Sequence, residues 1–240
     1  SAVILTYDRD VGLINVLENL NGCPHLNKVL VVWNNLARSP SNISWPSLHV
    51  PVEFILPEAN SLNNRFLPFD RLETDAVVSL DDDIDVTHDE LEFAFRVWRG
   101  SPDRLVGFPS RYHKWQGGKS AYGTDRFHGW RNGRGTYGAS SSCEYSMILT
   151  GFAFLHRNFM YEYFRQPKTI LSHIDSMKNC EDIAMNFLAS HLTRKSPIKI
   201  GHKTSWCKKC KVGLSGGGAH YGKRDKCVTL FTNIYGYNPL

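Results

Sequence analysis

The chain has 240 residues, of which 28 are Lys or Arg and 23 are Asp or Glu, and its formal net charge is +5. Hydrophobic residues make up 42% and aromatic residues 12%, enough for a packed core, which excludes a mainly disordered chain. No apolar run approaches the ~18 residues that a membrane-spanning helix needs. The first residues do not show the pattern of a signal peptide, since Ser1 leads almost directly into an apolar run. We therefore expect one large domain or two small ones, excised from a longer protein.

The first hundred residues predict strands that alternate with helices. Four short apolar runs have the length of buried strands, at residues 2–7, 28–33, 52–56 and 76–80. Apolar residues with helical spacing cover 11–20, and Thr87 with Glu90 forms a capping box for a helix over 88–99. This alternation predicts an α/β fold with a mainly parallel sheet.

The second half has a different pattern. Residues 117–138 are rich in glycine and aromatic residues, which predicts a long loop or a meander and not a helix. Strand character returns at 146–155. A helix is predicted over 181–191, with Ile183, Phe187 and Leu188 inward, and the tail predicts a strand over 227–235. No repeat or linker composition divides the chain, so a single domain is the economical interpretation.

Three consecutive carboxylates, Asp81, Asp82 and Asp83, follow directly on the predicted strand at 76–80. Ligands of open α/β sheets bind at the carboxyl ends of the strands. Three carboxylates at one place repel one another unless a cation or basic groups offset them. A divalent ion held by one or two carboxylates and by substrate phosphates is the simplest resolution. The alternative is a solvated acidic turn that caps the next helix, but the apolar strand before the triplet favours the ion.

Glu181 and Asp182 form a second acidic pair after Cys180, where they fit either a helix N-terminus or a site. Isolated arginines beside turns, at 9, 65, 111 and 224, fit a diphosphate or the solvent equally well. Basic residues also gather between 194 and 226, which suits an acidic ligand or a solvated surface. The chain has no P-loop, GxSxG or GxGxxG motif, which disfavours P-loop kinases, serine hydrolases and dinucleotide-binding proteins.

Six cysteines stand at 23, 143, 180, 207, 210 and 227. An even number indicates disulfides in an oxidising compartment, and the CxxC at 207–210 lacks the second ligand pair of a usual zinc site. Asn42 begins the chain's only glycosylation sequon, which gives weak support to a secretory setting.

Nine segments in chain order carry a resemblance to one family. They are LTYDR (5–9), LNKVLVVWNN (26–35), NSLNNRFLPF (60–69), ETDAVVSLDDD (73–83), FAFRVWR (93–99), VGFPSRYH (106–113), CEYSMILTG (143–151), NCEDIAMNFLASH (179–191) and IYGYNPL (234–240). Through them the chain resembles the C-terminal glycosyltransferase domain of the exostosins and exostosin-like proteins. The nearest branch is the exostosin-like N-acetylglucosaminyltransferases of heparan sulfate synthesis. Residues 117–138 have no counterpart in the pattern.

The resemblance implies a GT-A fold, Rossmann-like with helices flanking a mainly parallel sheet, as one domain over 1–240. Residues 1–100 would bind the nucleotide sugar, and residues 101–240 would carry the acceptor and catalytic half. The implied reaction is retaining, Mn²⁺-dependent transfer of N-acetylglucosamine or N-acetylgalactosamine from UDP. The implied acceptor is a glucuronic-acid-ended glycosaminoglycan, an acidic glycan, and no nucleic acid is expected as partner.

The resemblance also assigns donor-side roles to named residues. Asp83 would bind Mn²⁺, with Asp81 or Asp82 on the ribose or the donor sugar. The uridine side would be held by Thr6, Tyr7, Arg9 and Asn34. The nucleotide or diphosphate would be bound by Asn60 and Arg65.

On the catalytic side, Glu181 and Asp182 would lie near the anomeric carbon, and Arg224 would lie beside the leaving phosphate. A Cys180–Cys227 disulfide would tie the two segments together. Removing the charge of Asp182 or Arg224 is expected to lower turnover and to leave folding intact, because neither change removes core volume.

A different interpretation also fits the resemblance. The chain would then be a catalytically inactive module that binds a glycan or stabilises a partner glycosyltransferase. In either case we expect the lumen of the Golgi or endoplasmic reticulum, with a membrane anchor in a missing N-terminal part, and a homo- or hetero-oligomer is compatible with the sequence.

Overall fold

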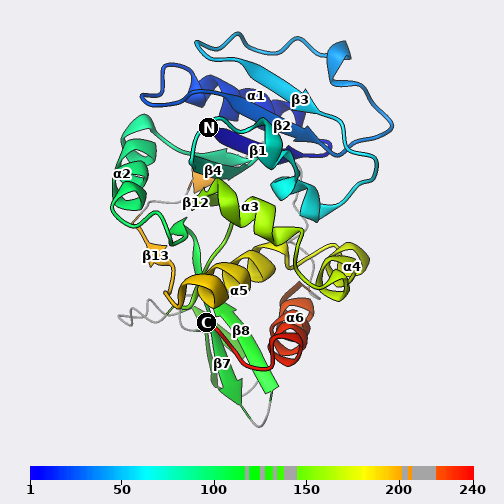
Figure 1. Cartoon of the computed structure of the whole chain (residues 1–240), viewed down its shortest axis with the longest axis vertical. Coiled ribbons are helices and arrows are strands. Elements are labelled where there is room, and N and C mark those ends of the chain that lie inside the picture. The colour runs from blue at the N-terminus through cyan, green and yellow to red at the C-terminus, as the bar shows by residue number, and fades with distance from the viewer. Residues whose placement is uncertain (117–118, 125–127, 132–133, 138–144, 202–204, 207–219) are drawn as a thin grey trace.

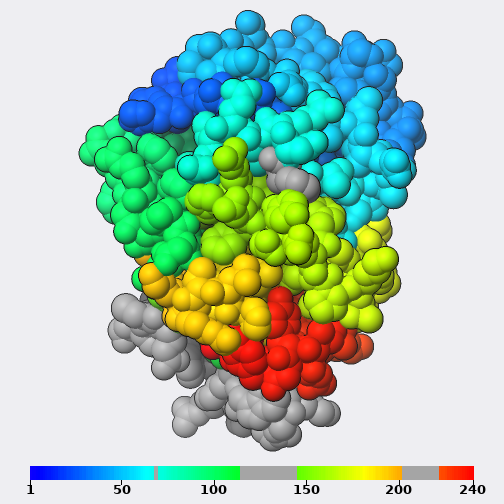
Figure 2. Space-filling view, in the orientation of Figure 1, coloured from blue at the N-terminus to red at the C-terminus, as the bar shows by residue number. Residues whose placement is uncertain are grey.

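The computed structural model describes residues 1–116, 119–124, 128–131, 134–137, 145–201, 205–206 and 220–240. Its centre is a seven-stranded mixed sheet with strand order β13-β6-β12-β4-β1-β2-β3 (Figure 1). In the space-filling view, the first third of the chain occupies one end of the molecule and the C-terminal helix lies toward the other (Figure 2). None of the helices in these described ranges is long and apolar enough to cross a membrane.

The first four strands of the sheet confirm the strands that were predicted from the apolar runs. They are β1 (Ala2–Thr6), β2 (Val29–Trp33), β3 (Val52–Ile55) and β4 (Ala76–Asp81). The pairs β1–β2, β2–β3 and β1–β4 are all parallel, so these four strands end at the same edge of the sheet. That edge receives the acidic triplet, because Asp81 is the last residue of β4.

The other half of the sheet begins with β12, which runs antiparallel to the four parallel strands. β12 (Phe152–His156) runs antiparallel between β4 and β6 (Val106–Gly107), and β13 (Ile198–Lys199) is parallel to β6. The start of β12 therefore lies beside the end of β4, where Asp81 N donates to Gly151 O at 2.9 Å.

Two layers of helices bury the two faces of the sheet. One apolar cluster packs α1 (Asp10–Leu20) and α2 (His88–Arg99) against one face. The other packs the opposite face against four further helices and the 3₁₀ segment η2 (Leu62–Arg71). These helices are α3 (Arg157–Tyr163), α4 (Lys168–Met177), α5 (Glu181–Thr193) and α6 (His220–Tyr235). The capping box predicted at Thr87 and Glu90 is present at the start of α2.

Helix α5 is central to this second layer. Ile183, Phe187 and Leu188 are inward, as predicted, but every residue from 181 to 190 is buried. A helix buried on all sides forces its first-turn acids into the interior as well, which the inward stripe alone did not indicate.

The predicted strand over 227–235 is wrong, because these residues belong to α6. The β-branched residues of the segment suggested a strand, but the buried positions have a helical spacing: Arg224, Cys227, Val228 and Phe231. The threonines accommodate the helix by donating to carbonyls one turn back, Thr229 to Asp225 at 3.0 Å and Thr232 to Val228 at 2.8 Å. Packing of one face overrides the intrinsic preference here.

Where it is described, the glycine-rich stretch forms antiparallel strands of two separate small sheets, and not one continuous meander. Within it, β8 (Lys119–Thr124) is antiparallel to the preceding strand β7 (Ser110–Gln116), and β9 (His128–Arg131) is antiparallel to β10 (Arg134–Tyr137). β11 (Met147–Ile148) pairs with β7, and the C-terminus ends beside that strand, where Asn238 Nδ2 lies 2.8 Å from His113 Nε2 (Figure 1). The small elements that remain are η1 (Pro40–Asn42), β5 (Ile84–Asp85) and β14 (Ser205–Trp206).

Candidate active site

The residues at the carboxyl edge of β1 and β4 form a compact charged group. Arg9, just before α1, donates from Nη1 to Asp82 Oδ1 at 2.8 Å and to Asp83 Oδ2 at 2.6 Å. Thr6, the last residue of β1, donates from Oγ1 to the other oxygen of Asp82 at 2.8 Å. The structure therefore brings together four residues that the resemblance placed on the donor side.

The three carboxylates of the triplet differ in exposure. The side chain of Asp82 is 8% exposed, against 20% for Asp83 and 33% for Asp81. Burial raises the pKa of Asp82 to about 6, although Arg9 and Thr6 stabilise its charged form. Burial, together with the neighbouring Asp81, also raises the pKa of Asp83. The two more exposed carboxylates, Asp81 and Asp83, are therefore the ones accessible to a ligand.

Arg65, from η2, connects the triplet to the start of α5. Its Nη2 lies 2.6 Å from Asp81 Oδ1, and its Nε lies 4.0 Å from Glu181 Oε1. The guanidinium is buried, and both acids lie beside it rather than in open solvent.

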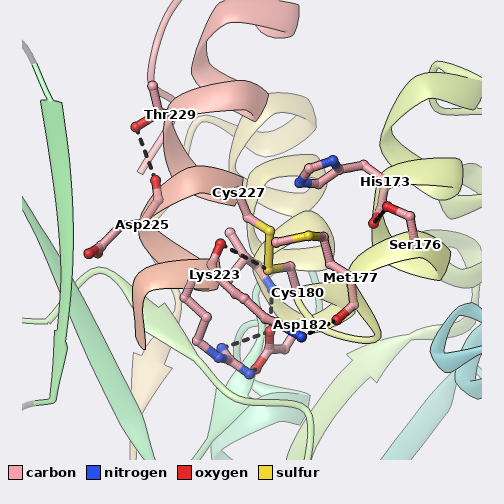
Figure 3. The surroundings of a disulfide bond; sticks show 11 residues. His173, Ser176, Met177, Cys180, Asp182, Lys223, Asp225, Cys227 and Thr229 are labelled. Atoms are coloured by element: carbon pink, nitrogen blue, oxygen red, sulfur yellow. Dashed lines mark hydrogen bonds and ion pairs between the residues drawn. A yellow bond between two sulfur atoms is a disulfide. The ribbon is translucent and has the colours of Figure 1, made fainter. Parts of the chain in front are cut away.

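The start of α5 is held by the predicted disulfide, which the structure confirms between Cys180 and Cys227. Figure 3 shows the bond joining α5 to α6, with Asp182 close by. Cys180 has a φ of 85°, in the left-handed region that favours glycine, so the chain turns sharply into the helix just before the acid pair. Such a backbone persists where the surrounding structure fixes it.

Asp182 and Arg224 form a buried, two-armed ion pair beside this disulfide. Arg224 Nη1 donates to Asp182 Oδ1 at 3.0 Å and Nη2 to Oδ2 at 2.8 Å, and the two residues are 6% and 3% exposed. The sequence led us to expect that either charge could be removed without a cost to folding. The burial of the pair argues against this for Arg224, because its removal leaves the buried Asp182 carboxylate without its two-armed partner.

Glu181 is a buried acid whose pKa is strongly raised. Burial and the adjacent Asp182 raise its pKa to about 7, although Arg65 and Arg224 oppose the rise. An acid with this pKa changes protonation state near neutral pH, which suits a group that works beside a reacting centre.

Other predicted residues lie nearby in different roles. Asn34 is buried, donates to Ser61 O at 2.7 Å and accepts from Asn64 at 2.8 Å, so its side chain joins two segments of the protein. Tyr7 is 53% exposed. Asn60 is exposed, and its carbonyl accepts from Lys178.

The comparisons with known proteins agree over the whole chain. The model of the family described as "Glycosyl transferase family 64 domain" matches residues 1–240. The chain belongs to glycosyltransferase family 64. It is 51% identical to the Exostosin-like-3 homolog of Caenorhabditis elegans and 40% identical to human Exostosin-2, in each case over all of this chain. The match covers only 28% and 32% of those two proteins, so the chain spans about a third of their length.

A solved structure of another protein has a fold similar to that of this family 64 domain. A Bacillus anthracis protein described as a glucose-1-phosphate thymidylyltransferase superposes with a TM-score of 0.52 at 10% identity, covering 86% of this chain and 88% of that one. The likeness confirms the α/β, GT-A-like architecture expected from the sequence and carries no more than that.

The donor set of the family 64 domain fits a divalent cation only in part. Among the described residues, no group of three or more His, Cys, Asp or Glu side chains is arranged to hold an ion by itself. Carboxylates are suitable ligands for Mn²⁺, and Arg9 and Arg65 only partly offset the triplet's charge. An ion at Asp83 would therefore have to take most of its ligands from a bound diphosphate and water, as Mg²⁺ does in many nucleotide sites.

The sequence assigned no role to Thr150 and Gly151, which form part of the site. The Thr150 carbonyl accepts from Arg65 Nη1 at 3.2 Å, and a Cβ on Gly151 would lie 2.4 Å from Asp81 Oδ2. Both residues end the segment CEYSMILTG (143–151) that carries the family resemblance, but no role was attached to them. Among the other cysteines, Cys23 is free and buried, whereas 143, 207 and 210 lie outside the described residues.

Proposed function

We propose that this family 64 domain transfers an N-acetylhexosamine, N-acetylglucosamine or N-acetylgalactosamine, from its UDP donor to a glucuronic-acid-ended acceptor, with retention of configuration. The proposal extends the relationship with the exostosins to the synthesis of heparan sulfate and related glycosaminoglycans. The observation that carries it is a row of charges that begins at the carboxyl edge of the sheet, with Arg9 and the triplet. The row continues through Arg65 to Glu181 and the Asp182–Arg224 pair at the start of α5.

The leaving group explains why a basic group, Arg224, belongs at the end of this row. UDP leaves with a developing negative charge on its diphosphate, and preorganised positive groups stabilise such a charge most where water is excluded. The guanidinium of Arg224 is buried and held in one orientation by Asp182 and by the nearby disulfide, so it needs little reorganisation during the reaction. Asp83 would hold a divalent ion, which would supply further positive charge to the diphosphate.

The acid pair at the start of α5 supplies the other half of the chemistry. Retention requires either a covalent intermediate or attack from the face that the leaving group vacates. Asp182 or Glu181 would act as the nucleophile in the first case and would stabilise positive charge on the anomeric carbon in the second. Both interpretations use the same two carboxylates, so both stay open.

The setting proposed for this reaction is the lumen of the secretory pathway. The Cys180–Cys227 disulfide supports an oxidising compartment. Asn42, in the sequon, is exposed at the end of η1, where a glycan can be attached without disturbing the core.

The experiment that tests the proposal measures UDP release and product formation together. The domain is incubated with Mn²⁺, a glucuronate-ended oligosaccharide and either UDP-N-acetylglucosamine or UDP-N-acetylgalactosamine. We expect UDP release that depends on both acceptor and metal, with the two donors distinguished by rate. A domain that binds UDP but makes no product with either donor would instead be the non-catalytic, glycan-binding or partner-stabilising module.

A further inference from the structure

Arg65 is fixed to the protein on one side of its guanidinium. Nη1 donates toward Ser79 Oγ at 3.3 Å and toward the carbonyls of Leu80 and Thr150 at 3.2 Å each. All three acceptors belong to the end of β4 or to the turn before β12, and the arginine side chain is only 6% exposed. The guanidinium is therefore attached to the sheet before any ligand arrives.

The other side of the same guanidinium faces two acids from different parts of the chain. Nη2 lies 2.6 Å from Asp81 Oδ1. Nε is buried and has no hydrogen-bond partner, and it lies 4.0 Å from Glu181 Oε1. A buried N–H without a partner is costly, so this donor is placed to receive the Glu181 carboxylate after a small movement.

Gly151 leaves room for the Asp81 carboxylate. A Cβ at position 151 would lie 2.4 Å from Asp81 Oδ2 and 2.9 Å from its Cγ. A side chain at position 151 would therefore push the Asp81 carboxylate out of its place beside Arg65.

We propose that Arg65 is a positioning residue, which ties the Asp81 carboxylate at the end of β4 to Glu181 at the start of α5 and does not itself bind the donor's diphosphate. The proposal rests on the proposed function, since it assumes that both acids work on a UDP-sugar. The consequence is that the distance between Asp81 at the donor site and Glu181 beside the reacting centre is fixed. Gly151 contributes by leaving room for the Asp81 carboxylate in this position.

Several charged or titratable groups face Glu181 from the elements around it. They are Arg65 from η2, Asp182 from α5, Arg224 from α6 and Tyr163 from α3. Arg65 and Arg224 favour the carboxylate form, whereas Asp182 and burial disfavour it. Moving the positive charge of Arg65 away from Glu181 should therefore displace the protonation of Glu181 to higher pH, while Arg224 and Asp182 stay in place.

The test compares Arg65→Lys with Arg157→Lys. Lysine keeps the positive charge, but as a compact group it cannot reach the strand carbonyls, Asp81 and Glu181 together. Arg157 is the matched control, because it also joins a carbonyl, Leu72 O at 3.0 Å, to a carboxylate, Asp75, at the opposite end of β4. Turnover, donor KM, the pH profile of kcat and UDP affinity are measured for both.

We expect Arg65→Lys to lower kcat about 10²-fold, the size of effect that a small misplacement of reacting groups produces. Donor KM and UDP affinity should stay close to wild type, and the limb of the pH profile that reports ionisation of Glu181 should move to higher pH. Arg157→Lys should change none of these. An unchanged pH profile together with a weaker UDP affinity would overturn the proposal and make Arg65 a diphosphate ligand.

Gly151→Ala tests the same geometry without touching Arg65. The added methyl group displaces the Asp81 carboxylate, so kcat should fall while UDP affinity and the melting temperature change little. Wild-type kcat in this variant would contradict the proposal. If the wild-type domain transfers no sugar at all, the proposed function fails, but the pH dependence of unfolding of Arg65→Lys still reports whether Arg65 acts on Glu181.

Discussion

The acidic triplet at the end of β4 and the acid pair at the start of α5 use the same kind of side chain in different surroundings. Asp81 and Asp83 keep part of their surface exposed, and the arginine that binds Asp83 is itself 20% exposed. Glu181 and Asp182 are buried, and a disulfide fixes the backbone just before them. The first region can admit a hydrated ligand, whereas the second is rigid and mostly dry. The difference suits a donor site that exchanges its ligand beside a reacting centre that must stay preorganised.

The comparison predicts that substitutions at α5 affect the free energy of unfolding far more than substitutions in the triplet. The largest effect is expected for Arg224→Ala, which leaves Asp182 charged and unpaired in the interior. Its free energy of unfolding should fall by about 3–5 kcal/mol, measured by urea denaturation.

The matched variant is the double substitution Arg224→Met with Asp182→Leu, which replaces the pair by apolar side chains of similar volume. Such replacements are often neutral or stabilising, so this variant should unfold close to wild type. If Arg224→Ala were as stable as wild type, the result would show that the pair is solvated and not buried.

The disulfide is expected to have the next largest effect. The sequence separation of its cysteines is 47, and closing such a loop is worth ~4 kcal/mol in the chain-entropy model. Cys180→Ser with Cys227→Ser should therefore lower the melting temperature clearly. Cys23→Ser, at the free cysteine, is the control for a buried thiol outside the site. Peptide mapping without reduction should recover the 180–227 linkage, and a free thiol at either position would remove the basis of this prediction.

A smaller effect is expected in the pH dependence of stability. Glu181 has its pKa raised to about 7 and Asp82 to about 6, both chiefly by burial, so the folded state holds their protons more tightly than the unfolded state does. Their stabilisation is complete below about pH 4, the usual range of unfolded carboxyl groups, and is lost as the pH rises through 6 and 7.

Glu181→Gln distinguishes the contribution of Glu181 to the pH dependence from that of Asp82, because it removes the titration of Glu181 and keeps the shape of the side chain. The fall in the free energy of unfolding between about pH 6 and 7 should disappear, while the part below pH 6 that Asp82 contributes should stay. Chemical denaturation at half-unit pH intervals measures both parts. Identical pH curves for variant and wild type would mean that Glu181 has an ordinary pKa.

The smallest effect on stability is expected for Asp83→Asn. The carboxylate is partly exposed and paired with a partly exposed Arg9, so the loss should stay below about 1 kcal/mol. Mn²⁺-dependent UDP binding should nevertheless be lost, because a carboxamide keeps the shape but not the charge. Asp85→Asn on β5 is the control for a nearby acid. Unchanged calorimetric affinity for UDP with Mn²⁺ in Asp83→Asn would exclude Asp83 as the metal ligand.

Much of the first region could be predicted from the sequence because its determinants are local. The apolar runs, the capping box at Thr87 and the carboxylates directly after β4 all lie where short-range patterns place them. The Cys180–Cys227 pairing came from family resemblance and not from spacing, since cysteine positions alone do not specify their connections.

The second region could not be predicted in the same way because its determinants are long-range. The burial of Asp182 and Arg224 results from α5 and α6 packing together, and β-branched residues concealed the helical spacing of α6. The contacts of Arg65 with Thr150 and of Asp81 with Gly151 depend on β12 entering the sheet antiparallel to β4. No local sequence pattern predicts that β12 pairs with β4.

The most direct test of catalysis at this site is the turnover of the stability-matched variant Arg224→Met with Asp182→Leu. At saturating UDP-N-acetylhexosamine and glucuronate-ended acceptor, and with its melting temperature close to wild type, this variant should lose about 10²-fold or more in kcat, the range expected when a charge-stabilising group is removed. A variant that folds normally and keeps near wild-type turnover would show that the buried pair serves only to hold α5 and α6 together.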